Sequence, residues 1–227
     1  MEILLIAGLW LDGSAWDKVV PRLASLGHHA IPLTLPGQGG GSGSATLDDQ
    51  VAAVLAAVDA TAGGPLVVGH SAASTLAWIA ADARPNKVRR VALIGGFPSA
   101  DEELYAGAFE SKDGMVPFPG WQPFEGPDSA DLDEETKRSI ASAAIPVPEA
   151  VARGVVHLSD ERRFDVPVTL ICPEFSVAQA REWVAGGEVP ELSTARHVDY
   201  LDIDSGHWPM FSRPAELATL LAEVANA

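Results

Sequence analysis

Short apolar runs alternate along the chain with longer stretches in which apolar residues recur at helical spacing. The short runs are typical of buried strands and cover residues 2–7, 29–33, 65–68, 90–94, 166–172 and 198–203. The helical patterns cover residues 14–26, 46–60, 72–83, 177–185 and 214–225. This alternation predicts an α/β fold with a roughly six-stranded, mostly parallel sheet that helices cover on both faces.

Two of the predicted helices carry recognisable start signals. Thr46 precedes one of them, and Asp49 follows at the spacing of a capping box. Ser14 precedes another, with Asp17 at the same spacing. We therefore expect Thr46 and Ser14 to cap two continuous helices.

One long stretch, residues 97–163, breaks the alternation. It is rich in proline, glycine, tryptophan and acidic residues, with helical patches but no clear strand. A disordered insertion is the alternative, but disordered segments are poor in aromatic residues, and this one contains Phe109, Phe118, Trp121 and Phe124. We therefore expect residues 97–163, called the cap segment, to form an inserted helical cap. The α/β core would then comprise residues 1–96 and 164–227, with the glycine-serine run at 39–44 as a flexible surface loop.

Composition and charge narrow the class of partners. Of the 227 residues, 47% are hydrophobic and 20% are charged, which suits one globular domain with a sizeable core. A formal net charge of −16 repels phosphate backbones and anionic lipids, so we expect neither nucleic acid nor a membrane as partner. The single cysteine, Cys172, and an N-terminus that lacks signal-peptide features predict a cytoplasmic protein.

The main chemical signal is a serine between a predicted strand and a predicted helix, in Gly69-His70-Ser71-Ala72-Ala73. A Gly-x-Ser-x-small segment in that context is the pattern of a nucleophile elbow, which exposes serine at the carboxyl end of a strand. A serine that merely caps the helix is the alternative. The elbow would also aim the backbone N–H of Ala72 at a developing oxyanion.

A histidine, His207, directly follows the last predicted strand. The carboxyl ends of parallel strands meet at one edge of a sheet, so a histidine on such a loop can reach Ser71. We therefore expect His207 to be the general base for a Ser71 nucleophile.

With these motifs, the whole chain resembles the α/β-hydrolase superfamily, in the branch of small serine esterases and hydroxynitrile lyases. Three further stretches carry the resemblance: IAGLW at 6–10 with GSAW at 13–16, LPGQG at 35–39, and DVP at 165–167. The resemblance implies that the N–H of Leu9 is the second oxyanion donor and that no metal or organic cofactor is needed. Trp10 would line the substrate pocket together with the cap residues Trp121 and Phe124. Ala7 departs from the family, which usually has a histidine there that steadies the oxyanion loop.

The acid of the catalytic triad is open at this stage. The family normally has an aspartate after the penultimate strand, but this chain has none there, and the matching position falls on Ser176 or Phe175 depending on the register. Glu174 is the only carboxylate at that strand end. A glutamate could orient the Nδ1–H of His207 as an aspartate does. Asp101, after the preceding strand, is an alternative, and the absence of any acid is another.

These features predict a serine hydrolase that cleaves an ester-like small molecule through an acyl-enzyme on Ser71, with His207 and Glu174 completing the triad. Two rival functions remain: a non-hydrolytic lyase of the same fold, and a catalytically weak, ligand-binding pseudoenzyme. The sequence names neither the substrate nor the oligomeric state.

Overall fold

The computed structural model describes residues 1–39 and 43–227. Residues 40–42, in the run expected to be a surface loop, lie outside the described residues. One parallel sheet has the strand order β2-β1-β3-β4-β7-β8. Its strands are β1 (Glu2–Ile6), β2 (His29–Leu33), β3 (Leu66–His70), β4 (Arg90–Ile94), β7 (Val168–Cys172) and β8 (Val198–Asp202). The predicted six-stranded α/β sheet is therefore confirmed.

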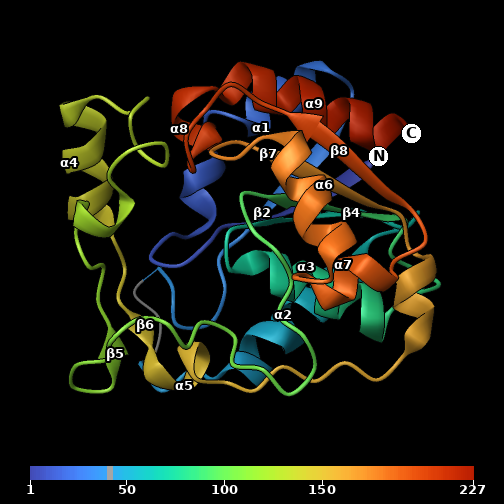
Figure 1. Ribbon diagram of the computed structural model, residues 1–227, viewed down its shortest axis with the longest axis horizontal. Helices are drawn as coiled ribbons and strands as arrows, with labels where there is room; N and C mark the ends of the chain where they lie inside the picture. Colours follow the sequence, from blue (N-terminus) through green and yellow to red (C-terminus); the bar gives the residue numbers. More distant parts are fainter. Residues whose placement is uncertain (40–42) are drawn as a thin grey trace.

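Helices cover both faces of this sheet (Figure 1). The helices α1 (Val20–Ser25) and α9 (Pro214–Asn226) pack on one face. The other face is covered by α2 (Leu47–Ala60), α3 (Ala73–Ala83), α6 (Val177–Gly186) and α7 (Pro190–Thr194). Successive strand residues point to opposite faces, so Ile3 joins one core and Leu4 the other. Burial on both faces explains why the four inner strands, β1, β3, β4 and β7, read as nearly continuous apolar runs.

The two predicted helix starts have different outcomes. Thr46 and Asp49 form the expected reciprocal capping box at the start of α2. The continuous helix expected over 14–26 is wrong, because a 3-10 turn, η1 (Gly13–Trp16), precedes α1. Asp12, rather than Ser14, is the cap, with its carboxylate accepting the Ser14 N–H at 2.9 Å. Pro21 favours a fresh helix start, because proline lacks the N–H that an interior turn needs.

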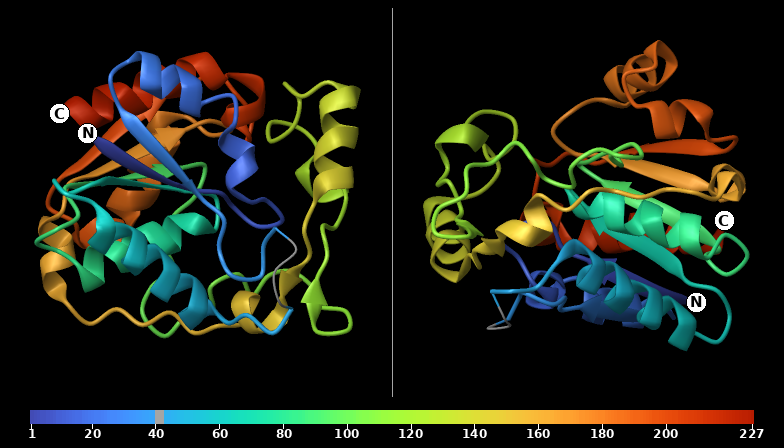
Figure 2. Two further views of the ribbon diagram at one scale, coloured as in Figure 1. Left: turned by 180° about the vertical axis from the view of Figure 1, so that it is seen from behind. Right: turned by 90° about the horizontal axis from the view of Figure 1, so that it is seen from below.

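The cap segment lies beyond the carboxyl ends of the parallel strands (Figure 2). Its helical elements are η2 (Gln122–Phe124), α4 (Glu134–Ala143) and α5 (Glu149–Ala152), with η3 (Glu161–Asp165) where the chain returns to the core. It also contains two short antiparallel strands, β5 (Met115–Val116) and β6 (Val147–Pro148). Two-residue strands are too short to show a period-two pattern, so the sequence pattern indicated only the helical elements of this segment.

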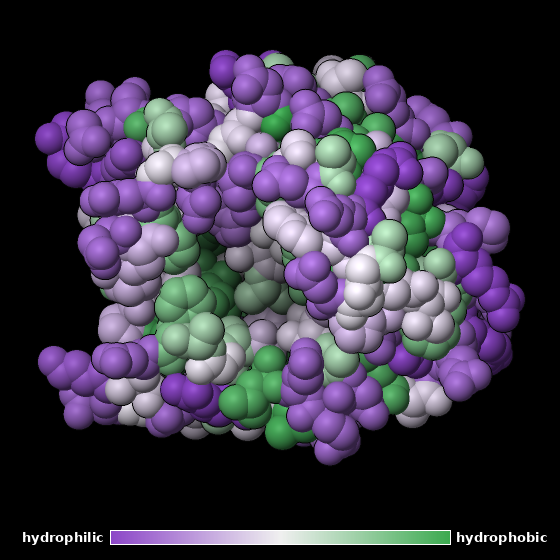
Figure 3. Space-filling model, viewed as in Figure 1, coloured by the Kyte–Doolittle hydropathy of each residue, from purple (hydrophilic) through white to green (hydrophobic). Residues whose placement is uncertain are grey.

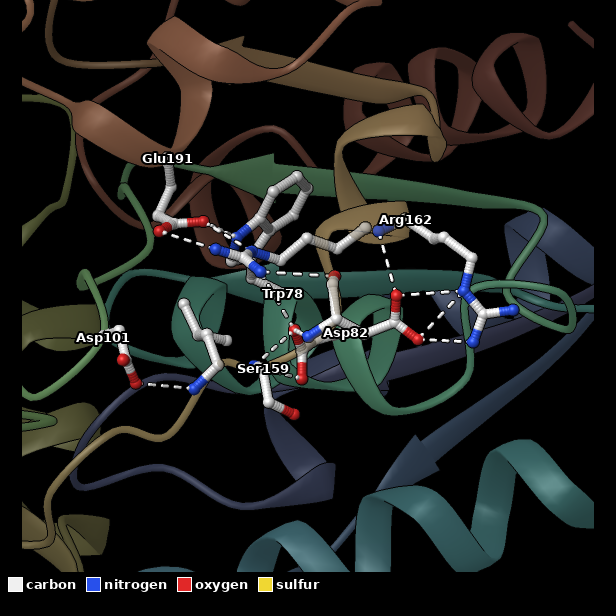
Figure 4. A network of polar contacts seen from close by, with 9 residues as sticks. Trp78, Asp82, Asp101, Ser159, Arg162 and Glu191 are labelled. Carbon is white, nitrogen blue, oxygen red and sulfur yellow. Dashed lines mark hydrogen bonds and ion pairs between the residues drawn. The ribbon is translucent and has the colours of Figure 1, made fainter.

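A buried polar network joins the end of the cap segment to the core (Figure 4). The guanidinium of Arg163 lies between the carboxylates of Glu191 and Asp82, at 2.7 Å and 3.2 Å. Glu191 also accepts the indole N–H of Trp78 at 2.8 Å. Asp82 accepts the backbone N–H of Ser159 at 3.0 Å. These bonds pair charges that would be costly to bury alone, and they tie α7 and the cap return to α3.

The last short helix is α8 (Pro209–Ser212), which directly precedes α9. Within the described part of the chain, no helix combines the length and apolar character that crossing a membrane requires.

Candidate active site

Ser71 lies in a strained turn between β3 and α3. Its φ angle is +55°, in the left-handed region that residues other than glycine seldom adopt. Its backbone N–H donates to the carbonyl of Ile94 at the end of β4, at 2.8 Å. This is the geometry expected of a nucleophile elbow, in which the surrounding structure maintains the strain of the turn.

The elbow depends on two glycines that let backbones approach closely. A Cβ atom at Gly69 would lie 2.3 Å from the carbonyl oxygen of Ala73, where α3 begins. A Cβ atom at Gly96 would lie 2.4 Å from the carbonyl oxygen of Ser71 itself. Any side chain at either position would therefore displace the serine.

His207 and Glu174 form a close pair at the carboxyl ends of β8 and β7. The Nδ1–H of His207 donates to Oε1 of Glu174 at 2.7 Å, and both side chains are largely buried. Because a carboxylate can only accept, this bond assigns the proton to Nδ1 and leaves Nε2 as the acceptor in neutral His207. The expected contact between the two residues is therefore present. The other oxygen of Glu174 is buried without a hydrogen-bond partner among the described residues.

The alternative acid, Asp101, is engaged elsewhere. Its carboxylate accepts the backbone N–H of Leu158 at 2.8 Å, and it lies beside Glu102 and His157 on the surface. These three exposed side chains are close enough to share a cation, but nothing else in the structure points to one. Among the two carboxylates weighed from the sequence, Glu174 is the one that contacts His207.

His70, directly before Ser71 in the sequence, is hydrogen-bonded to the loop that carries His207. Its imidazole is fully buried, and its Nε2–H donates to the backbone carbonyl of His207 at 2.8 Å. Burial, and to a smaller extent the nearby His207, lowers the pKa of His70 to about 3. His70 is therefore a neutral donor at physiological pH. Sequence reasoning gave it no role, although its place beside Ser71 in the elbow was a usable signal.

A cavity of about 130 Å³ opens beside Ser71. It is lined mainly by apolar and aromatic side chains, together with the two histidines: Leu9, Trp10, His70, Ser71, Ala72, Tyr105, Ala106, Phe109, Phe124, His207 and Trp208. Ser71 and His207 thus share one cavity. The molecular face is hollowed where the cap segment meets the core, with hydrophobic residues on the walls of the hollow (Figure 3).

The expected pocket residues divide into two groups. Trp10 and Phe124 line the cavity beside Ser71, as do Tyr105 and Phe109, which sequence reasoning did not assign to the pocket. Trp121 lies further out: its ring packs against Trp208, and its indole N–H donates to the carbonyl of Lys137 at 3.1 Å. The expectation that Trp121 lines the pocket is therefore corrected for the cavity beside Ser71, because this hydrogen bond and the edge-on ring contact hold Trp121 outside its lining.

The backbone at Leu9 and Ala72 fits the expected oxyanion donors. Both residues line the cavity beside Ser71. Among the hydrogen bonds of the described residues, neither of their N–H groups has a protein acceptor. Two free N–H groups beside a nucleophile are what a tetrahedral oxyanion requires.

Comparison with known proteins shows which family the chain belongs to. The model of the alpha/beta hydrolase family matches residues 3–220. The chain belongs to the alpha/beta hydrolase family. A pimeloyl-[acyl-carrier protein] methyl ester esterase of Aliivibrio salmonicida (strain LFI1238) is 26% identical over 174 residues. That alignment covers 70% of this chain and 66%, just under two thirds, of the esterase.

Solved structures of other hydrolases share the fold of this family member over its whole length. An extracellular alpha/beta-hydrolase from a Paenibacillus species superposes with a TM-score of 0.82 at 14% identity, covering 100% of both chains. A pyrethroid hydrolase from Sphingobium faniae JZ-2 superposes with a TM-score of 0.77 at 19% identity, covering 100% of this chain and 98% of its own. At these identities the likeness concerns the fold alone.

Proposed function

We propose that this hydrolase cleaves small carboxylic esters through an acyl-enzyme on Ser71. The observation that carries the proposal is the 2.7 Å bond from His207 to Glu174, on a histidine that shares a cavity with the elbow serine. The esterase activity of the relative from Aliivibrio salmonicida supports the reaction class. A cytoplasmic location, and the absence of nucleic-acid and membrane partners, stay predictions from the sequence.

The chemistry proceeds in two halves. His207 Nε2 takes the proton of Ser71 Oγ as that oxygen attacks the ester carbonyl, and the N–H groups of Leu9 and Ala72 stabilise the oxyanion. The tetrahedral intermediate breaks its bond to the alcohol oxygen, which takes the proton from His207. Water then attacks the acyl-enzyme by the same route, releasing the acid and restoring the Ser71 hydroxyl. Glu174 holds His207 in the required tautomer and stabilises the imidazolium.

The rival functions now have different standing. A catalytically weak binding protein was suggested by the missing triad aspartate and the missing oxyanion-loop histidine, and the Glu174 contact weakens the first of these arguments. A lyase of the same fold would use Ser71 and His207 as a proton-transfer pair without forming an acyl-enzyme. Trapping of a covalent acyl intermediate therefore separates the hydrolase from the lyase.

The cavity limits the size and charge of what lies beside Ser71. A cavity of about 150 Å³ accommodates benzene in another protein, so about 130 Å³ suits a short acyl chain or one small ring. Among the described residues, its lining includes neither a carboxylate nor a lysine or arginine. We therefore expect the acyl or alcohol group beside the nucleophile to be small and uncharged.

The decisive experiment combines hydrolysis with covalent labelling. Purified protein should release alcohol from short neutral esters and should be labelled by a fluorophosphonate. Ser71→Ala should abolish labelling and nearly all hydrolysis, whereas Ser142→Ala, an exposed serine on α4, should change neither. Full activity in Ser71→Ala would refute the proposal.

A further inference from the structure

The cap segment makes several contacts with Trp10, the residue after the proposed oxyanion donor Leu9. Trp10 is 94% buried and has a φ angle of +64°, a strained conformation for a tryptophan. Its indole N–H donates to the carbonyl of Val116 at 3.1 Å, and its own carbonyl accepts the N–H of Ile145 at 2.9 Å. Both partners belong to the cap segment, as do the rings of Phe109, Phe118 and Phe124 that pack edge-on against Trp10.

The cap segment also forms hydrogen bonds with the loop that carries His207. The backbone N–H of His207 donates to the carbonyl of Asp128 at 2.8 Å, and Ser205 Oγ donates to the Asp131 carboxylate at 3.2 Å. The contact is tight, because a Cβ atom at Gly206 would lie 2.4 Å from the carbonyl oxygen of Asp128. The carboxyl group of Asp128 lies near Glu174, and its pKa is raised first by burial and then by the charge of Glu174.

We propose that the cap segment is a positioning element of the catalytic centre, in addition to covering it. Its backbone holds the oxyanion loop through Trp10 and the histidine loop through Asp128, so both are in place only while the cap segment is seated on the core. The inference rests on the proposed function, because it assigns the roles of Leu9 and His207 as above.

A physical need for such support is visible in the backbone of Trp10. The strained backbone of Trp10 persists only if its surroundings enforce it. The two hydrogen bonds and three ring contacts from the cap segment supply that enforcement. A misplacement of about 1 Å at such groups can lower turnover by about two orders of magnitude.

Gly206→Ala tests the histidine side of the proposal. The φ angle of Gly206 is not in the positive range, so alanine fits its backbone, and the obstacle to the new methyl group is the cap loop at Asp128 and Asp131. We expect kcat to fall at least about tenfold, with KM changed by less than about twofold. Gly63→Ala is the matched control, because a Cβ atom there meets nothing within 4 Å. Its kinetics should equal those of the wild type.

A spectroscopic readout separates this inference from the proposed function. In Ser71→Ala protein, which needs no activity, the Nδ1–H proton of His207 should give a low-field NMR resonance from its bond to Glu174. Adding Gly206→Ala should shift or broaden that resonance while the far-ultraviolet circular dichroism stays native. An unchanged resonance, or unchanged kcat in a variant that merely melts earlier, would overturn the cap inference. Absence of hydrolysis in wild-type protein would instead overturn the proposed function.

Trp10→Phe tests the oxyanion side. The variant keeps an aromatic ring but removes the N–H that binds Val116, a hydrogen bond worth about a factor of ten. We expect kcat to fall by about that factor, with a similar loss for esters whose acyl groups differ in size. A loss confined to one ester size would mean that Trp10 only shapes the pocket, and that half of the inference would be wrong.

Discussion

His70 Nε2 lies 2.8 Å from the backbone oxygen of His207, so the residue before the nucleophile holds the loop of the proposed general base. This bond connects the elbow at the end of β3 to the loop after β8. The imidazole is fully buried, and this burial lowers the pKa of His70 to about 3 although the hydrogen bond itself favours the protonated form. The cost of protonating a buried imidazole has consequences for stability.

His70 should make the protein sensitive to acid. Below about pH 6.5 the unfolded state binds a proton at His70, whereas the native state does not until about pH 3. Because protons then bind preferentially to the unfolded state, the free energy of unfolding should fall by about 1.4 kcal/mol per pH unit across that window. Above pH 6.5 both states are neutral, and this contribution vanishes.

His70→Gln provides the comparison, since a glutamine amide can still donate to the His207 carbonyl but does not titrate. Urea denaturation at a series of pH values should show a shallower loss of stability for His70→Gln than for wild type between pH 6.5 and 4. His29→Gln, at an exposed histidine, should retain the wild-type slope. Identical slopes for all three proteins would contradict the prediction.

Glu174→Gln should lower kcat at least about a hundredfold with little change in KM, because the imidazolium loses its counter-charge mainly in the transition state. Steady-state kinetics on one short ester measure this. Asp101→Asn is the control, since Asp101 binds the Leu158 N–H rather than His207, and it should retain near-wild-type kcat. The reverse pattern would transfer the role of the acid to Asp101.

Phe124→Ala and Trp121→Ala should behave differently. Phe124 lines the cavity beside Ser71, so its loss should shift preference toward bulkier esters. Trp121 packs on Trp208 outside that lining, so its loss should lower the melting temperature with less effect on preference. Relative kcat/KM over an ester series, with melting curves for both variants, checks this. Equal shifts in preference would place Trp121 in the substrate path after all.

Glu191→Ala should destabilise the protein by about 3–5 kcal/mol, because it leaves the buried charge of Arg163 without its closest partner. Asp165→Ala removes a carboxylate from the exposed pair with Arg196 and should cost at most about 1 kcal/mol. Chemical denaturation of both variants measures the difference. A cost for Glu191→Ala as small as that for Asp165→Ala would mean that the buried network in Figure 4 contributes little.

The local pattern of the chain was enough to predict the sheet, the elbow and the loop that carries His207. Strands buried on both faces must be apolar throughout, and the elbow needs small residues such as Gly69 at defined spacing, so both features are written into short stretches. The capping box of Thr46 and Asp49 was readable for the same reason. Ser14 was misread because its own N–H and hydroxyl donate to Asp12, which caps a separate 3-10 turn, and because Pro21 favours a new helix start.

The tertiary structure alone decided which acid faces His207, which aromatic residues reach the cavity, and what supports the catalytic loops. Glu174 and Asp101 both follow strands, and only the packing of those strand ends separates them. Trp121 and Phe124 are three positions apart in one aromatic stretch and both pack against Trp208, yet only Phe124 lines the cavity beside Ser71. The hydrogen bonds that His207 makes to His70 and Asp128 join residues remote in sequence through the backbone atoms of His207, and no residue pattern predicts such partners.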